Sequence, residues 1–170
     1  MKFFSNQSVL CTLLLAVLLL QGCAHTNRAL DPSFKAQVGS VLDINTSLEI
    51  TVLGPPPYSW NSDIEFRVRN MSSNRVSFAT DLGNKLFVLN GGQWKQVLNR
   101  DRYLGESFVL APPHPGELTA DDVTSFARPA LDNSLVAGKA YSLRIFVEGK
   151  MLSSEGDVPV GAYVDVKLSP

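Results

Sequence analysis

The chain has 170 residues, of which 15 are basic and 16 acidic, and its formal net charge is −1 at pH 7. Its charges are spread along the chain and form no basic patch of the kind that neutralises phosphates, so we expect no nucleic-acid partner. The length fits a single domain with a sizeable core.

The first residues are typical of a secretory signal. Lys2 supplies a positive start, and residues 9–20 form an apolar run without charge. The run is too short for a membrane-spanning helix, which needs about 20 apolar residues. We therefore expect a signal peptide rather than a transmembrane anchor.

The apolar run ends in Leu20-Gln21-Gly22-Cys23, which resembles the lipobox of bacterial lipoprotein precursors. The resemblance implies cleavage between Gly22 and Cys23, and a diacylglyceryl group on the sulfur of Cys23. In Gram-negative members of that class, a residue other than Asp after this cysteine favours the outer membrane, and Ala24 occupies that position here. The alternative is an ordinary signal whose first mature residue happens to be cysteine.

Cleavage would remove Lys2 and Cys11 but no acidic residue, which leaves 14 basic and 16 acidic side chains and a net charge of −2. The mature chain would hold one cysteine and no internal disulfide, so its stability must come from a packed core. We expect three parts: a signal peptide (1–22), a lipidated N-terminus and tether with a partly ordered end (23–46), and a folded domain (47–170).

Short segments of alternating apolar and polar residues, separated by turn residues, predict an all-β fold. The expected strands are 48–52, 64–69, 76–80, 86–89, 94–98, 108–111, 141–147 and 162–168. Asn90-Gly91-Gly92-Gln93 predicts a tight hairpin that brings Trp94 onto the core face with Phe87 and Leu89. Segment 117–124 is expected to form one helical turn or an irregular crossing, and Val123, Phe126 and Leu131 are expected to point inward.

The stretch 135–145 resembles the E-to-F corner of fibronectin type III and related immunoglobulin-like sandwiches. Leu135 comes first, Gly138 lies in a small-residue turn, and Tyr141 follows six positions after the leucine. The resemblance implies that the Tyr141 hydroxyl bonds back to the corner backbone; the chain departs from the family at Ala137, where proline is usual. We expect an antiparallel two-sheet immunoglobulin-like sandwich of seven to eight strands, with an up-and-down barrel as the alternative.

Few residues suit catalysis or metal binding. His114 lies between prolines, and a Ser-His-Asp set with Asp121 or Asp122 would lack the glycine pattern that surrounds a nucleophilic serine. We expect no enzyme activity, no cofactor and no metal, since the domain has no second histidine or cysteine.

Two stiff proline-rich loops are the candidate binding surfaces: Pro56 with Tyr58 and Trp60, and Pro113 with His114. Tyr58 and Trp60 have an alternative role as a cover over one end of the sandwich. The sequence thus favours a non-enzymatic, membrane-anchored envelope lipoprotein that binds a protein partner. The alternatives are a protease inhibitor that presents a proline-rich loop, and a hydrolase accessory domain that uses His114, Asp121 and Asp122.

Overall fold

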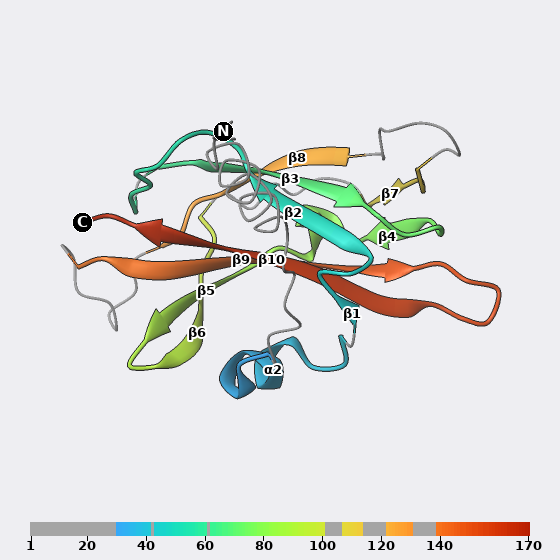
Figure 1. Cartoon of the computed structure of the whole chain (residues 1–170), viewed down its shortest axis with the longest axis horizontal. Coiled ribbons are helices and arrows are strands. Elements are labelled where there is room, and N and C mark those ends of the chain that lie inside the picture. Colours follow the sequence, from blue (N-terminus) through green and yellow to red (C-terminus); the bar gives the residue numbers. More distant parts are fainter. Residues whose placement is uncertain (1–29, 42, 61, 101–106, 114–121, 131–138) are drawn as a thin grey trace, which may run out of the picture. The chain divides into compact units, whose positions relative to one another are not determined.

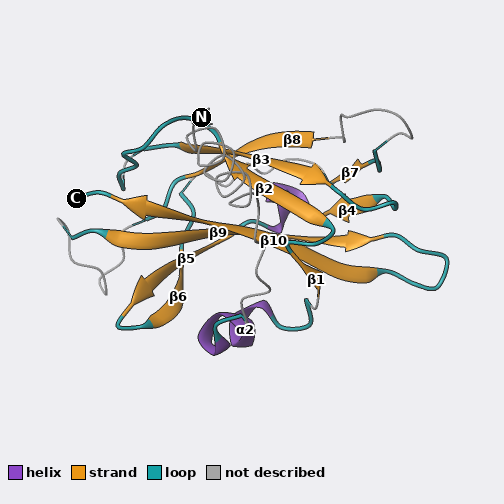
Figure 2. Ribbon diagram, viewed as in Figure 1, coloured by secondary structure: helices purple, strands orange, loops and turns teal. Residues whose placement is uncertain are grey.

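The computed structural model describes residues 30–41, 43–60, 62–100, 107–113, 122–130 and 139–170. Pro32–Pro170 form one compact unit, in which the described strands build two sheets and one short α-helix covers the larger sheet (Figure 2). The prediction of an all-β two-sheet sandwich is confirmed.

The smaller sheet has the order β2-β3-β8 and is antiparallel throughout. Its central strand carries the clearest alternation in the chain, because every second side chain from Ile64 to Asn70 is buried. These buried residues face the larger sheet, and the charged residues between them face outward. The strands are β2 (Leu48–Val52), β3 (Ile64–Asn70) and β8 (Asp122–Ala127).

Strand β8 corrects the expectation for its segment. Residues 122–127 pair with β3 as an edge strand rather than forming a helical turn or an irregular crossing. The prediction that Phe126 points inward is wrong, since its side chain is 49% exposed. Phe126 pairs with the outward-facing Glu65, so the parity of the sheet directs both to solvent.

The larger sheet is organised around β9. One edge of β9 pairs with β10 along its whole length, and the other edge pairs with β4 and β5 in turn (Figure 1). A two-residue strand, β1, extends the sheet in parallel beyond β10. The strands are β1 (Asp43–Ile44), β4 (Val76–Phe78), β5 (Lys85–Asn90), β6 (Gln93–Val97), β7 (Phe108–Leu110), β9 (Tyr141–Met151) and β10 (Val158–Leu168).

Strands β4 and β5 are two parts of one interrupted edge. Phe78 lies opposite Gly149, and Lys85 lies opposite Phe146. Six residues therefore lie between Phe78 and Lys85, whereas only two residues of β9 lie between their partners. The extra residues form a 3-10 turn, η2 (Thr80–Gly83), in which Asp81, Leu82 and Gly83 all have positive φ. This left-handed turn returns the Leu82 side chain to the core, where it is 2% exposed.

The hairpin between β5 and β6 confirms the prediction from sequence. Asn90 pairs with Gln93, and Gly91 and Gly92 form the two-residue loop with φ values of 60° and 77°. Positive φ at both loop residues favours glycine. Leu89 lies opposite Trp94, which is 6% exposed, so Trp94 is buried as expected, but on the outer face of the larger sheet rather than in the core between the sheets.

Candidate functional site

Several of the predicted site residues lie outside the part of the chain that the structure describes. These are the signal-cleavage and lipidation residues, the histidine of the second proline-rich loop, and the first two residues of the corner: Gly22, Cys23, His114, Leu135 and Gly138. The last residue of the corner is described. Tyr141 opens β9, and its ring meets Trp60 edge-on at 5.4 Å between centroids.

The loop from Gly54 to Trp60 divides into an exposed part and a buried part. Pro56 is exposed, whereas the Trp60 side chain is 6% exposed and belongs to the core. The half-buried Tyr58 joins the two parts: its hydroxyl donates to the Gly54 carbonyl at 2.7 Å, and its own carbonyl accepts from Ser169 N at 2.7 Å. Trp60 therefore covers one end of the sandwich, which is the alternative that the sequence left open.

The second proline-rich loop and Asp122 make few contacts, within the described residues, that could define a site. Pro113 is half-buried, and Asp122 lies 3.6 Å from Arg67 across the smaller sheet in an ion pair whose side chains are both more than one-third exposed. Within the described ranges, no group of three or more His, Cys, Asp or Glu residues is placed to hold a metal ion.

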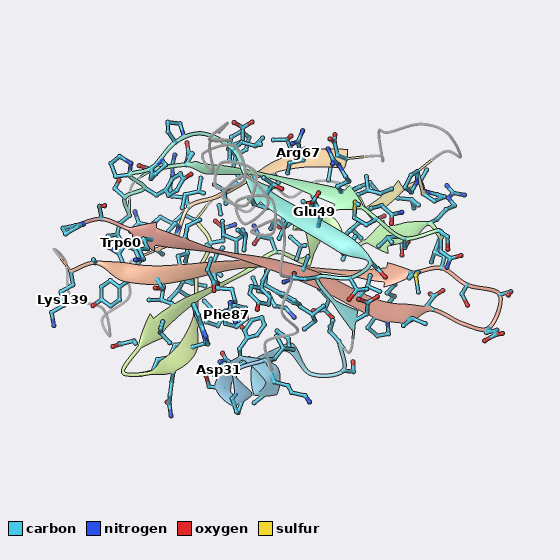
Figure 3. All side chains as sticks on the ribbon, viewed as in Figure 1. Asp31, Glu49, Trp60, Arg67, Phe87 and Lys139 are labelled. Carbon is cyan, nitrogen blue, oxygen red and sulfur yellow. The ribbon has the colours of Figure 1, made fainter. Side chains whose placement is uncertain are left out.

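Helix α2 (Pro32–Val38) covers the outer face of the larger sheet, and its central contact is an aromatic cluster. Phe34 is fully buried, with its ring edge-on to Phe87 at 5.2 Å, to Phe146 at 5.5 Å and to Tyr163 at 5.4 Å. Figure 3 shows Phe87 on the side of the sheet that faces α2. The cluster gives β5 and β9 a second covered face, opposite the core between the sheets.

Arg144 lies within this cluster as a buried cation, 6% exposed. Its Nε and one terminal nitrogen each bond to an oxygen of Asp165 at 2.7 Å in a bidentate pair. The guanidinium carbon also lies over three aromatic rings, 3.8 Å from the centroid of Tyr163, 4.1 Å from that of Trp94 and 4.5 Å from that of Phe34. A planar cation suits this site because it satisfies a carboxylate in its plane and contacts rings above and below.

Two polar side chains hold α2 to the edge strand β6. Ser33 Oγ accepts from the backbone N–H of Trp94 at 3.0 Å, and Gln37 Nε2 donates to the Trp94 carbonyl at 2.5 Å. Ser33 and Gln37 are four residues apart, so they lie on one side of the helix. The backbone N–H and C=O of Trp94 that point away from β5 are thus hydrogen-bonded to side chains of α2, while its ring packs on Arg144.

Residues 23–46 were expected to form a tether with a partly ordered end, so helix α2 was not predicted, and no role was predicted for Arg144. The signal that could have indicated the cluster is that neighbouring strands each carry one aromatic residue at a position that alternation directs outward, Phe87 and Phe146 among them. A strand with one solvated face would carry polar residues there.

The described residues thus define a β-sandwich of two sheets. A short helix covers the larger sheet, and a buried arginine lies among aromatic rings beneath this helix. No family model, curated protein or solved structure matches the chain. Among the described residues, no helix has the length and apolar character needed to cross a membrane.

Proposed function

We propose that this protein is a non-enzymatic envelope lipoprotein, anchored through lipid on Cys23, whose β-sandwich binds a protein partner. The observation that carries the proposal is the lipobox-like stretch Leu20–Cys23, which is separated by eight residues from the compact unit that begins at Pro32. The anchor would be stable, because two or more acyl chains hold a protein on a bilayer where one chain binds only marginally. In a Gram-negative host, Ala24 favours the outer membrane, with the sandwich in the periplasm.

The strand order supports an immunoglobulin-like arrangement. In such an arrangement, β2-β3-β8 would be strands A, B and E, and the run β10-β9-β5-β6 would be strands G, F, C and C′. Tyr141 stands at the start of the strand equivalent to F, where the tyrosine of the corner belongs. Sandwiches of this kind commonly present binding loops at their ends.

The exposed loop Gly54–Tyr58 is the surface that supports partner binding best. Its three prolines are exposed, and the hydrogen bond between the Tyr58 hydroxyl and the Gly54 carbonyl closes the loop on itself. A loop held in one shape loses little conformational entropy when a partner binds. Trp60 contributes by fixing the base of the loop in the core rather than by contact with the partner.

Two experiments test the proposal. Replacement of Cys23 by serine should abolish incorporation of labelled palmitate and move the protein out of the membrane fraction; unchanged processing and fractionation would refute the anchor. A photo-crosslinking residue at Pro56 in the membrane-bound protein should capture one stoichiometric partner, whereas the same residue at the exposed Thr51 of β2 should not. Equal labelling at both positions would refute the binding loop.

The same exposed loop favours a protease inhibitor as the second candidate, because an inhibitor presents a rigid segment to the enzyme. A broad panel of proteases distinguishes the two. Inhibition that is lost when Pro56 and Pro57 are replaced by glycine would favour the inhibitor, and absence of inhibition would favour the envelope partner.

A further inference from the structure

The outer face of the larger sheet and helix α2 together form a basic surface, here called the α2 face. Strand register places five cations on it and two carboxylates. Both carboxylates are paired, Glu148 with Lys85 at 2.6 Å and Asp165 with Arg144 at 2.7 Å. Counted over the strands and α2, the net charge of this face is 5 − 2 = +3, and it comes from the exposed residues Lys35, Lys150 and Lys167. Asp31, directly before α2 (Figure 3), and Arg75, directly before β4, add one charge of each sign.

The outer face of the smaller sheet has the opposite sign. Its two cations are paired with carboxylates across the strands, Arg69 with Glu49 and Arg67 with Asp122, both at 3.6 Å. Glu65 adds one further negative charge on the same face, so the balance is 2 − 3 = −1. Figure 3 shows Glu49 and Arg67 on this sheet, away from α2. The sandwich is thus polarised across its layers, with the positive side at α2.

The polypeptide enters the folded unit on the positive side. Pro32 begins α2, and nine residue steps separate it from Cys23. Fully extended, nine residues reach about 30 Å. The outer surface of the smaller sheet lies two layer spacings beyond α2, or about 20 Å, since sheets pack about 10 Å apart and helices about as far from a sheet. If the outer surface of the smaller sheet faced the membrane, the chain between Cys23 and Pro32 would have to extend over most of its maximal length. If α2 faced the membrane, a small part of that length would suffice.

From this charge distribution and tether length, and resting on the proposed lipidation of Cys23, we propose that the α2 face contacts an anionic phospholipid surface. Lipid chains on Cys23 hold the protein at the bilayer, and Lys35, Lys150 and Lys167 select which side of the sandwich lies against it. Each lysine close to an anionic membrane strengthens the contact about fivefold, equivalent to about 1 kcal/mol. The proline loop Gly54–Tyr58 then remains available to a partner.

Single-cysteine labelling of the lipidated protein tests this orientation. Cys11 would leave with the signal and the sulfur of Cys23 would be lipidated, so a cysteine introduced at Gln96 or Thr124 would be the only free thiol. Both positions are exposed, Gln96 on the outer face of the larger sheet and Thr124 on that of the smaller sheet. The full chain is matured in its host membrane, reconstituted into vesicles with one part phosphatidylglycerol to three parts phosphatidylethanolamine, and energy transfer from a donor on the cysteine to an acceptor lipid is measured.

We expect greater transfer from Gln96 than from Thr124, and a smaller difference in 1 M salt, where the screening length falls to about 3 Å. Substituting Lys35, Lys150 and Lys167 by glutamine should remove the difference. A control variant loses the same total charge from exposed positions off this face, through the substitutions Lys95→Gln, Arg100→Gln and Lys139→Gln, and should preserve it.

The outcomes separate this proposal from the one on which it rests. Membrane-bound protein with equal transfer from both positions, or with greater transfer from Thr124, overturns the orientation and leaves lipidation intact. Protein that stays soluble overturns lipidation itself. If both triple variants lose the difference equally, net charge rather than the α2 face determines orientation, which also overturns the proposal.

Discussion

Replacement of Phe34 by alanine should destabilise the folded unit by about 3–5 kcal/mol, the range for a buried phenylalanine. Phe34 is fully buried, and its ring makes three edge-on aromatic contacts. Such pairs contribute about 0.5–1.5 kcal/mol each beyond the burial of their surface. The upper part of the range therefore applies if α2 stays in place and leaves a cavity, and the lower part applies if the helix relaxes onto the sheet.

The assay is urea unfolding of a chain that begins at Ala24, which needs no detergent because it lacks Cys23. Tryptophan fluorescence reports the transition, since Trp94 lies in the cluster and Trp60 at the end of the core. The matched control is Lys35→Ala, an exposed neighbour on the same helix whose replacement should change stability by less than about 0.5 kcal/mol. A loss below about 1 kcal/mol for Phe34→Ala would refute the packing of α2 on the sheet.

Three further substitutions address other parts of the fold by the same unfolding assay. Asn70→Ala should cost about 2–4 kcal/mol, because the two N–H groups of the buried Asn70 amide are shared among three backbone carbonyls and its oxygen accepts from the Ser72 N–H and hydroxyl; a loss of a few tenths of a kcal/mol would contradict this role. Gly83→Ala should destabilise more than Gly91→Ala, since both have positive φ but only at Gly83 would a Cβ meet a backbone oxygen, at 2.5 Å; equal losses would argue against this close approach. Arg144→Lys should cost about 1.5–3 kcal/mol by removing the bidentate pair and the ring stacking, and wild-type stability would show that a point charge suffices.

The sequence predicted those parts of the fold that local pattern determines. Alternation in Leu48–Val52 and from Ile64 onward depends only on neighbouring residues, and the observed strands begin at the expected positions. The Gly91-Gly92 loop likewise fixes the pairing of the hairpin by its own backbone preference.

The parts that the sequence did not reveal depend on contacts between distant residues. Helix α2 has seven residues, too few for a helical period to stand out, and its stability comes from rings that lie far along the chain. Arg144 reads as an outward residue of an alternating strand until its partner Asp165, 21 positions later, and the cover of Phe34 are known. Phe126 was misassigned because an apolar residue on an exposed edge strand has the same local pattern as one that faces the core.

The bonds from Ser33 and Gln37 to the backbone of Trp94 have a consequence for molecules that share one membrane. Trp94 lies next to the Asn90–Gln93 pair that closes the hairpin, so its N–H and C=O point away from β5, toward where another strand would add. Edge strands with open backbone groups recruit copies of themselves, a hazard that grows when molecules are concentrated in two dimensions. Because side chains of α2 bond to the backbone N–H and C=O of Trp94, proteolytic cleavage within residues 32–38 should expose these groups and leave a sandwich that aggregates through β6.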